Sequence, residues 1–542
     1  MKTLKDYDEL PYSDCPISVS RPDNLYVIGR LFQLQPAPPD NCKVLELGCA
    51  GGGNLIPLAF YWPNSEFVGV ELSQHQAAQA NQIIKTLQLS NISILHQDLM
   101  TLLQGQDQEF GHFDYIIAHG VYSWVPAEVQ QQLLTLCNVL LKPDGIAYIS
   151  YNTLPGWEQR NMLRDMMRYH SRNAATTTEQ LNKSLEMLTL LHKGMPENGS
   201  LSERWVRLQA EELLEKPANY VYHDYLEKHN TPVYFHQFAQ QAAQHQLQYF
   251  AEASLYTMLS STLTTEAEAA LDQFEDPIEY EQYMDFFYLK HFRQSLLCHA
   301  QRNPQRQINL DVLKECYFYS DLYIKDDIDL FAQDPQSFTS PSGDSYVVSH
   351  PMSKAALAEL LMAYPGTYGF DELKQRAAVT VRDYGDAKFA DDADSLFSEI
   401  VNLYLSGAIN VTTVDRQYTT AIEDKPKFNA LSRMFCQFNK FSLASVHHDS
   451  IALNQLQRKL IKLADGQHDL HQITAGLSKA INENENLRAD YVSMRNPLIE
   501  KGSLSESKNP EAIDPDFVRQ AITNLAYLGL LDVACLPTTD LR

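Results

Sequence analysis

The sequence predicts an α/β fold in which a Rossmann-like sheet is followed by a helical domain and by tandem winged-helix-like domains. Three patterns carry this prediction. An apolar run at residues 44–47 ends in a glycine-rich turn, further apolar runs alternate with helical stretches, and two C-terminal segments repeat each other. The 542 residues are enough for several domains. We expect four, at residues 1–170, 171–325, 326–424 and 425–542.

The turn after the first predicted strand reads Gly-Cys-Ala-Gly-Gly-Gly at residues 48–53 and opens a helix. Glycines let a ligand lie against the main chain, and the amides at the helix start face it. Gly48, Ala50 and Gly53 loosely match the pattern of dinucleotide-binding turns. Glu46 argues against a dinucleotide, because a carboxylate repels a pyrophosphate but can hold the cationic amino acid end of S-adenosylmethionine. The turn therefore favours S-adenosylmethionine.

Polar side chains also follow the next predicted strands. The strand at residues 67–70 ends in Glu71, whose carboxylate can accept both ribose hydroxyls of an adenosine. Asp98 follows the third strand and can take the adenine amino group, and His119 follows the fourth. Because parallel strands end at one edge of a sheet, these groups are expected at one ligand site.

Composition excludes several classes of protein. The formal net charge of −25 argues against binding to a phosphate backbone and favours a basic partner, such as a lysine-rich protein segment. No apolar run is long enough to span a membrane, and the N-terminus lacks an apolar signal core, so we expect a cytoplasmic protein. The eight cysteines lack metal-ligand spacing, so neither a disulfide framework nor a metal site is predicted.

Residues 172–323 have helical periodicity nearly throughout, including residues 279–300. Such a block can cover a substrate cleft or pair two subunits as a homodimer, and the sequence does not decide between them. The leader at residues 7–16 is aromatic and turn-forming, and is either a lid over the ligand or an ordinary strap.

The C-terminal part contains an internal repeat. Residues 360–366 recur at 460–466, and residues 402–411 match 524–533, which gives two copies of a winged-helix pattern. Residues 482–510 are expected to form a polar loop. Acids around the third helix of the first copy would repel DNA, so we expect contact with protein or packing within the chain. These acids are Asp383, Asp386, Asp391, Asp392, Asp394 and Glu399.

Several motifs together resemble one family. They are Tyr7-x-x-x-Pro11-Tyr12, the turn at residues 46–54, Ala-His-Gly-Val-Tyr-Ser-Trp-Val at 118–125 and Tyr-Asn-Thr-Leu-Pro-Gly-Trp at 151–157. The combination resembles bacterial class I S-adenosylmethionine-dependent methyltransferases that carry a methyltransferase regulatory domain. The best-known members are rickettsial protein lysine methyltransferases that act on an outer-membrane surface protein. Residues 223–226, 230–235, 249–253 and 292–298 resemble the regulatory part.

The resemblance implies a set of cofactor-binding residues at the methionine end, the ribose, the adenine and the sheet edge below the sulfonium. Two positions depart from the family pattern, since Ala50 stands where glycine is commoner and Arg21 stands where relatives usually have histidine. The implied cofactor site consists of Glu46, Gly48, Cys49, Ala50, Gly51, Asn54, Glu71, Leu72, Asp98, Leu99 and His119.

A lysine acceptor must be neutral to attack a methyl group. Lowering its pKa from ~10.4 to 7 costs about 4.6 kcal/mol, at ~1.36 kcal/mol per unit, so burial and aromatic contact must help. Aromatic rings can also hold the product ammonium by cation–π contact, and Asn152 can accept a hydrogen bond from the amine. Each ring has a packing role as its alternative. The predicted acceptor site comprises Tyr12, Tyr122, Trp124, Asn152 and Trp157, with Tyr151 as a further ring.

Three functions are compatible with these patterns. The first is a methyltransferase for lysine side chains of a protein, which the motifs and the acidic charge favour. The second is a methyltransferase for a small molecule. The third is a non-catalytic scaffold that binds S-adenosylmethionine, which the presence of Glu46, Glu71 and Asp98 disfavours.

Overall fold

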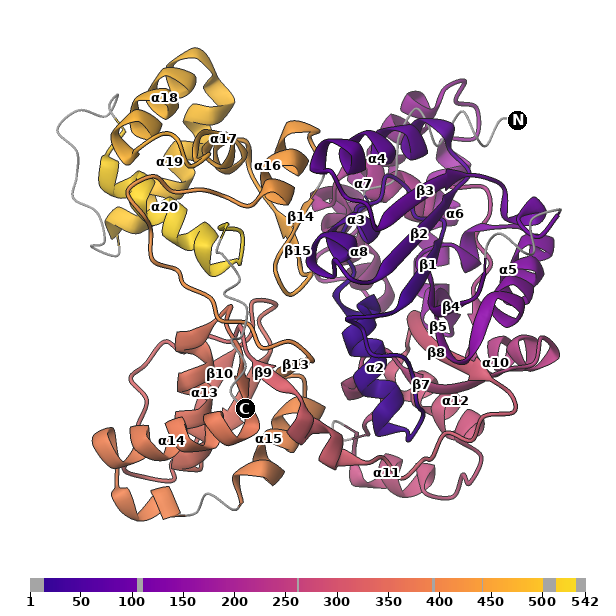
Figure 1. Cartoon of the computed structure of the whole chain (residues 1–542). Helices are drawn as coiled ribbons and strands as arrows, with labels where there is room; N and C mark the ends of the chain where they lie inside the picture. Colours follow the sequence, from indigo (N-terminus) through magenta and orange to yellow (C-terminus); the bar gives the residue numbers. More distant parts are fainter. Residues whose placement is uncertain are drawn as a thin grey trace.

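The computed structural model describes residues 14–104, 111–260, 263–391, 395–440, 442–500 and 513–532 (Figure 1). A sheet domain, drawn in indigo to magenta, is followed by helices and by two C-terminal units drawn in orange to yellow. The predicted α/β fold with winged-helix character at the C-terminal end is confirmed.

The sheet follows the strand order β3-β2-β1-β4-β5-β8-β7, and the short β6 pairs with the end of β5. β1 to β5 run parallel, whereas β8 is antiparallel to both β5 and β7. The order reverses between β1 and β4, which is where ligands bind in open α/β sheets. The strands are β1 (Lys43–Leu47), β2 (Glu66–Glu71), β3 (Ile92–His96), β4 (Phe113–Ala118), β5 (Leu141–Leu154), β6 (Val233–Tyr234), β7 (Leu247–Glu252) and β8 (Phe292–His299).

Helices cover both faces of the sheet because side chains on β1 alternate between them. Val44 packs with α2, α3 and α4, whereas Leu45 and Leu47 pack with α5 and α10, and all three are 0% exposed. Glu46 lies between the two leucines and faces the side of α3. The helices around the sheet are α2 (Pro22–Leu31), α3 (Leu55–Tyr61), α4 (Gln74–Leu87), α5 (Ala127–Leu140), α6 (Trp157–His170) and α10 (Phe235–Gln244).

The segment predicted to be helical also supplies β6, β7 and β8, so the sheet continues past the predicted boundary at residue 170. The predicted helix at residues 279–300 is wrong, because it divides into α12 (Pro277–Tyr288) and β8. β8 pairs with β5 from Asn152↔Phe292 to Ala147↔Leu297. A strand partner this distant leaves no local periodicity in the sequence.

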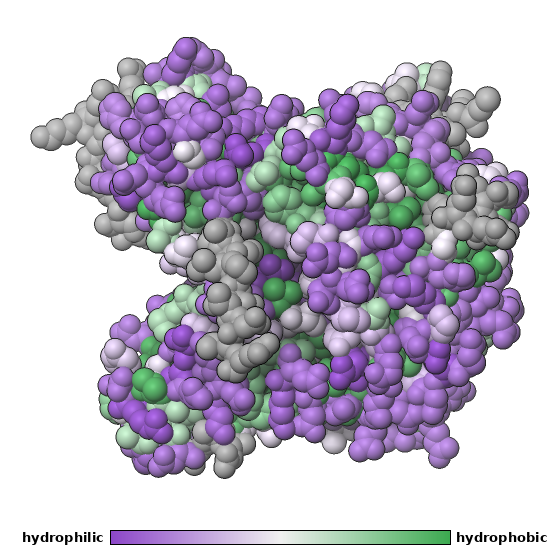
Figure 2. Space-filling model, viewed as in Figure 1, coloured by the Kyte–Doolittle hydropathy of each residue, from purple (hydrophilic) through white to green (hydrophobic). Residues whose placement is uncertain are grey.

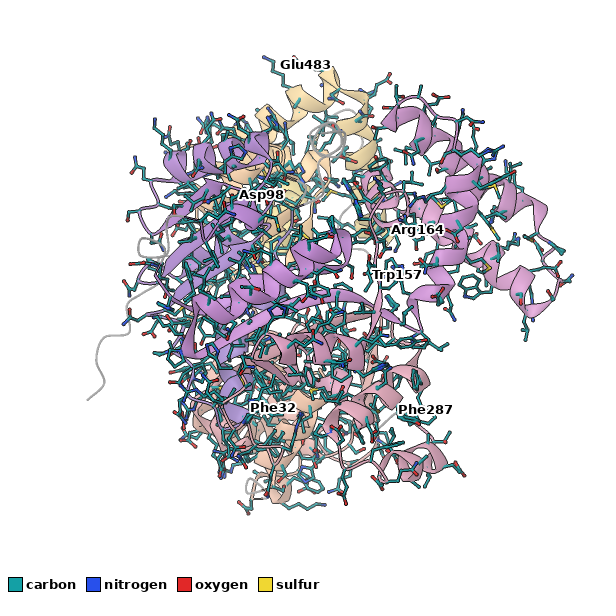
Figure 3. All side chains as sticks on the ribbon, turned by 90° about the vertical axis from the view of Figure 1, so that its right-hand side faces the viewer. Phe32, Asp98, Trp157, Arg164, Phe287 and Glu483 are labelled. Atoms are coloured by element: carbon teal, nitrogen blue, oxygen red, sulfur yellow. The ribbon has the colours of Figure 1, made fainter. Side chains whose placement is uncertain are left out.

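A helical arm with its own core follows the sheet domain. α7 (Thr177–Gly194), α8 (Leu201–Glu215) and α9 (Ala218–Tyr225) pack with α6, and a capping box of Ser200 and Glu203 begins α8. In Figure 3 this arm projects from the sheet, and the labelled Trp157 and Arg164 lie at its base. Pairing of two copies through this block stays a prediction. A further helix, α11 (Thr265–Leu271), precedes α12.

The two C-terminal units have the same layout, as the repeat predicts. In the first unit, β9 pairs with β12 on one side and with β13 on the other. In the second unit, residues 427–428 occupy the position of β9, and the isolated bridges Lys427↔Asp465 and Phe428↔Leu531 correspond to these two pairings. In each unit a β-hairpin precedes the helix that begins the repeat: β10–β11 precede α13, and β14–β15 precede α17. The elements are β9 (Tyr317–Tyr319), β10 (Gln336–Thr339), β11 (Ser345–Val348), α13 (Pro351–Ala363), β12 (Tyr368–Gly369), α14 (Phe370–Tyr384), α15 (Leu396–Leu405), β13 (Asn410–Thr412), then α16 (Ala430–Gln437), β14 (Ser442–Ala444), β15 (Ser450–Ala452), α17 (Gln455–Leu463), α18 (Leu470–Glu483), α19 (Glu485–Glu500) and α20 (Pro515–Tyr527).

The polar loop predicted at residues 482–510 is wrong for its first half, which forms α19. Leu487 and Tyr491, four residues apart, are buried, and the Tyr491 ring meets Phe517 at 4.9 Å between centroids. Met494 and Leu498 pack against the same core, so apolar residues recur at helical spacing along one face of a helix whose composition is polar. Residues 501–510 lie outside the described part of the chain.

The visible face in Figure 2 is mostly hydrophilic, with hydrophobic residues gathered over α4 and the nearby end of the sheet. Within the described ranges, no helix is both long and apolar enough to cross a membrane.

Candidate functional site

The glycine turn follows β1 directly and is fixed by the ends of the neighbouring strands. The amides of Gly48 and Cys49 donate to the carbonyl of Val70 at the end of β2. Ala50 has φ +48°, the left-handed conformation, and its amide donates to Glu71 Oε2 at 2.9 Å. Glu71 therefore stabilises the turn through this hydrogen bond. The ribose contact that the sequence predicts for Glu71 stays a prediction. Burial raises the pKa of Glu71, against hydrogen bonds from backbone amides that lower it.

The glycines at positions 51 and 53 make room for the protein itself. A Cβ at Gly53 would lie 2.6 Å from the backbone of Asp14, and one at Gly51 would collide with Lys440 Nζ and with Asp14. The sequence interpretation assigned this free space to a ligand. At these two glycines the space is instead filled by the N-terminal segment and by the C-terminal unit.

Glu46 forms the buried floor of the site and is 4% exposed. Its Oε1 accepts a hydrogen bond from Asn54 Nδ2 at 3.1 Å, whereas its Oε2 has no hydrogen-bond partner in the described structure. Burial raises the pKa of Glu46 to about 8, and the charges of Asp14 and Glu71 act in the same direction. A buried carboxylate oxygen without a partner fits a cationic ligand group, because the cation would restore the ionised form.

The remaining predicted cofactor residues differ in how they can act. Asp98 is exposed at the end of β3, and its Oδ1 accepts the amide of Met100 at 2.9 Å. Leu72 is exposed and Leu99 half-buried beside the two acids. Cys49 is buried with its sulfur against Gly69, so only its backbone can face a ligand.

His119 lies at the end of β4, where its Nδ1 is 2.8 Å from the hydroxyl of Tyr148. Its ring stacks on Tyr148 and meets the edge of Phe292, both at 5.9 Å between centroids. Burial lowers the pKa of His119 to about 4, so the imidazole is neutral at pH 7. It therefore adds no positive charge where a cationic sulfonium is expected.

A cleft of about 240 Å³ opens beside His119, between the sheet domain and the helical arm. Three predicted acceptor residues, Trp124, Asn152 and Trp157, line it together with His119. The two indole rings meet edge to face at 6.1 Å. Asn152 is oriented by its side-chain amide, which donates to Asn230 Oδ1 at 3.1 Å.

Tyr122 is a correction to the predicted acceptor site. Its ring is 0% exposed, packs against Tyr151 and Phe238 in the core, and its hydroxyl bonds Gln241. The 3-10 turn Tyr122–Trp124 directs this ring inward, so Tyr122 does not line the cleft. Tyr151 is likewise a core residue, at 1% exposed. Tyr12 lies outside the described residues.

Sequence reasoning did not assign six of the ten residues that line the cleft. Arg160 connects the missed residues, because it donates to Tyr220 at 3.3 Å and to His291 Nε2 at 3.1 Å, and its guanidinium lies 5.2 Å from the Trp157 ring. Asp224 is one helical turn after Tyr220 on α9. Two signals were present in the sequence: this spacing of four residues, which any helix can show, and the resemblance of residues 223–226 and 292–298 to the regulatory part, which does not assign them to a cleft. The missed lining residues are Gly120, Arg160, Tyr220, Asp224, His291 and Phe292.

Two titratable groups of the cleft have shifted pKa values. Burial raises the pKa of Asp224 to about 6, against the hydrogen bond from Tyr220 and the charge of Arg160, which lower it. Burial and the charge of Arg160 lower the pKa of His291 to about 4. At neutral pH the cleft therefore contains one carboxylate, one guanidinium and neutral imidazoles. Within the described ranges, no group of histidine, cysteine and acidic side chains could hold a metal ion.

Three stretches of the chain match known families. Residues 45–147 match a family described as "Methyltransferase domain", residues 217–299 one described as "Predicted methyltransferase regulatory domain", and residues 424–495 one described as "PKMT, C-terminal winged helix domain". The fold and these matches define a methyltransferase of the Rossmann-like class.

Similarity to individual proteins extends over almost the whole chain. It is 31% identical over 516 residues to Uncharacterized protein RP789 of Rickettsia prowazekii, covering 91% of this chain and 92% of that protein. It is 28% identical to PKMT2 from Rickettsia typhi, whose structure is solved in complex with AdoHcy, with a TM-score of 0.80 and coverage of 96% of this chain and 100% of that chain. The chain therefore belongs to the S-adenosylmethionine-dependent methyltransferases that carry a methyltransferase regulatory domain and a PKMT winged-helix domain.

Proposed function

We propose that this methyltransferase modifies lysine side chains of a protein. The observation that carries the proposal is the composition of the cleft beside His119, where Trp124, Trp157 and Phe292 stand with the carboxylate of Asp224 and the guanidinium of Arg160. Aromatic rings attract an alkylammonium by cation–π contact, and the carboxylate of Asp224 offsets the positive charge of Arg160, so the cleft does not repel the cation. The names of the family at residues 424–495 and of the similar structure support the same acceptor.

The cofactor supplies an electrophilic methyl group on a sulfonium. Glu46 would hold its ammonium end, Glu71 and Asp98 its ribose and adenine, and the backbone of residues 48–50 would lie against it. Asn54 supports Glu46 through the hydrogen bond described above. His119, neutral at pH 7, would add no positive charge beside a sulfonium bound at the sheet edge.

The acceptor residues have two tasks, which are to bind the amine and to favour its neutral form. Asp224 is ionised above pH 6 and attracts the incoming ammonium. The indoles of Trp124 and Trp157 exclude water around the amine, which lowers its pKa by desolvation and releases the proton to solvent. The amide oxygen of Asn152 can then accept one N–H and orient the nitrogen lone pair.

The size of the cleft is a second observation that supports a protein acceptor. Pockets for small molecules usually measure about 300–1,000 Å³. The cleft of about 240 Å³ lies near the lower end of this range and is large enough for one extended side chain delivered by a larger substrate. This favours a protein acceptor over a free small molecule.

The test is intact-mass analysis of a lysine-rich protein incubated with the full-length chain and S-adenosylmethionine. We expect added methyl groups on lysine. Asp224→Asn should raise the KM for the acceptor about tenfold, equivalent to ~1.4 kcal/mol, and leave the KM for the cofactor unchanged. Asp165→Asn, on an exposed acid of α6, is the matched control and should change neither.

Each alternative has its own outcome. Methyl label found only in low-mass products would replace the proposal with a small-molecule acceptor. Binding of S-adenosylhomocysteine without methyl transfer to any acceptor would favour the scaffold. An unchanged acceptor KM in Asp224→Asn would remove the cleft from the proposal.

A further inference from the structure

The C-terminal unit reaches the cofactor turn with a buried lysine. Lys440 follows α16 and is 4% exposed. Its Nζ lies 2.6 Å from Asp14 Oδ2, 2.8 Å from the carbonyl oxygen of Gly51 and 3.4 Å from Gln79 Oε1 on α4. The same Asp14 oxygen accepts the amide of Gly53 at 3.1 Å. Lys440 and Asp14 therefore hold both ends of the glycine segment.

A second contact reaches the floor of the cofactor site. His448 is 2% exposed, and its Nε2 is 2.8 Å from Asn54 Oδ1. Asn54 in turn donates to Glu46 and to Ser20 Oγ. His448 is thus one residue removed from the carboxylate that would hold the cofactor's ammonium end.

The turn that carries His448 is strained and is held from outside. His448 has φ +66°, a left-handed conformation that is costly for a residue with a side chain, and it lies between β14 and β15. Such a conformation persists where the surroundings fix it. Its contact with Asn54 in the sheet domain is one such constraint.

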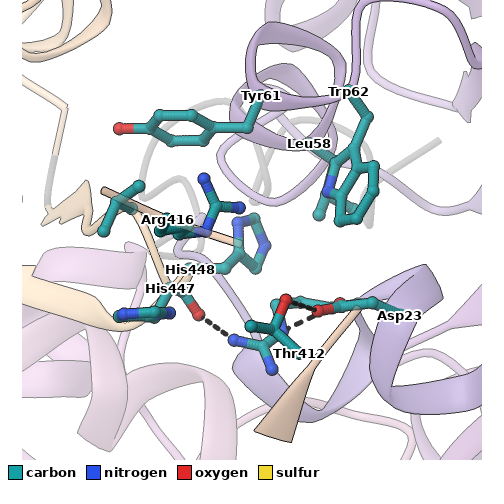
Figure 4. Close-up of a pocket in the computed structure, with 10 residues that line it drawn as sticks. Asp23, Leu58, Tyr61, Trp62, Thr412, Arg416, His447 and His448 are labelled. Atoms are coloured by element: carbon teal, nitrogen blue, oxygen red, sulfur yellow. Dashed lines mark hydrogen bonds and ion pairs between the residues drawn. The ribbon is translucent and has the colours of Figure 1, made fainter. Parts of the chain in front are cut away.

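Arg21 anchors the other side of this turn, and it lines the small junction that Figure 4 shows around Asp23, Thr412 and His447. Arg21 donates to the His447 carbonyl, to the Tyr319 hydroxyl at 3.0 Å and to the Val411 carbonyl at 3.3 Å. Asp23 pairs with Arg21 and accepts a hydrogen bond from Thr412. The cavity there measures about 10 Å³, room for at most one water molecule, so the three segments are closely packed.

We propose that Lys440 and His448 are positioning residues of the cofactor site, so that cofactor binding and docking of the C-terminal unit strengthen each other. The turn can change shape on binding only if Asp14, Lys440 and Asn54 move with it. Because coupling of two sites is reciprocal, bound cofactor should hold the hairpin β14–β15 in place, and loss of the hairpin contacts should weaken the cofactor. The inference rests on the cofactor of the proposed function and is independent of the acceptor.

The experiment measures binding of S-adenosylhomocysteine to the full-length chain by calorimetry. Lys440→Met keeps the apolar stem and removes the ammonium, and we expect its Kd to rise at least tenfold. Lys462→Ala removes an exposed lysine on α17 of the same unit and should stay within twofold. Hydrogen exchange supplies a second readout, in which the ligand should slow amide exchange at residues 442–452 in the parent chain and not in Lys440→Met.

The outcomes separate this inference from the proposed function. No binding by the parent chain would overturn both. Binding by the parent and an equal Kd in folded Lys440→Met, or exchange at 442–452 that ignores the ligand, would overturn the coupling alone. Circular dichroism of each variant establishes that it is folded.

Discussion

The buried carboxyl of Glu46 gives a quantitative prediction about proton release. Because its pKa is raised to about 8, the carboxyl is mostly protonated at pH 7 in the chain without cofactor. A cationic ammonium beside the unpartnered Oε2 would ionise the carboxyl. Binding of S-adenosylhomocysteine should therefore release close to one proton at pH 7 and few at pH 9, where the group is already ionised.

The same pKa shift predicts how stability depends on pH. A carboxyl whose pKa is raised from 4.5 to about 8 favours folding in its protonated form. Stability is therefore lost as pH rises from 4.5 to 8. Linkage gives a loss on the order of 3–4 kcal/mol between pH 5 and pH 8 from this group alone. Glu46→Gln cannot titrate and should lack this component, although its amide nitrogen would be buried without a partner.

The assay is calorimetry in buffers of different ionisation enthalpy, because the slope of apparent enthalpy counts the protons released. The parent chain should show a slope close to one proton at pH 7, and Glu46→Gln a slope near zero with weaker binding. Glu66→Gln, on an acid at the start of β2 whose side chain is 69% exposed, is the control. A slope near zero in the parent, or an equal slope in Glu46→Gln, would refute the assignment of Glu46 to the cationic end.

Two further predictions concern residues away from the cofactor. Arg293→Met leaves Glu252, Glu281 and Asp285 buried without their shared guanidinium. Urea unfolding at pH 7.5 should therefore show that the free energy of unfolding falls by at least about 3 kcal/mol. This decrease should be smaller at pH 5, where carboxyls protonate, and a decrease that does not depend on pH would contradict the ion-pair explanation. Tyr122→Phe keeps the core packing and removes one hydroxyl, so kcat and KM should stay within about twofold while stability falls by about 1 kcal/mol; a tenfold loss of kcat in a folded variant would restore Tyr122 to the acceptor site.

Sequence reasoning placed the candidate cofactor residues at one edge of the sheet because their signals are short-range. The turn after β1 and the acids after β2 and β3 each follow an apolar run within a few residues, and strand order alone brings them to one edge. The glycines show the limit of the same reasoning. A glycine indicates that another group lies close to the backbone. At Gly51 and Gly53 these groups are Asp14 and Lys440, and the sequence around the glycines does not identify them.

The rest of the site depends on distant pairings. Tyr220 and Asp224 reach the cleft because α9 packs on α6, and His291 and Phe292 reach it because β8 pairs with β5. The error at Tyr122 has a different origin. A residue just past a strand end can face the cleft or the core, and one 3-10 turn decides which.

Arg21 stands where similar sequences usually have histidine, and its contacts give a physical reason for the arginine. Its guanidinium has several donors in a fixed plane, and here they reach β9, β13 and the His447 carbonyl at once. A histidine ring has two nitrogens and could not satisfy all three acceptors. Arginine at this position therefore suits a chain in which the segment before α2 joins both C-terminal units.

The position of the second winged-helix unit indicates whether its hairpin could bind nucleic acid. The turn of its hairpin is buried, with Ser445, His447 and His448 each at most 2% exposed. This turn contacts the sheet domain through Asn54 and Arg21, so in this arrangement it is not free to enter a nucleic-acid groove. The repulsion expected from the acids of the first unit and from the net charge of −25 acts in the same direction. Packing against the sheet domain therefore accounts for the hairpin of this unit without a nucleic-acid partner. The same packing places the hairpin beside Asn54, where we expect cofactor binding to stabilise it.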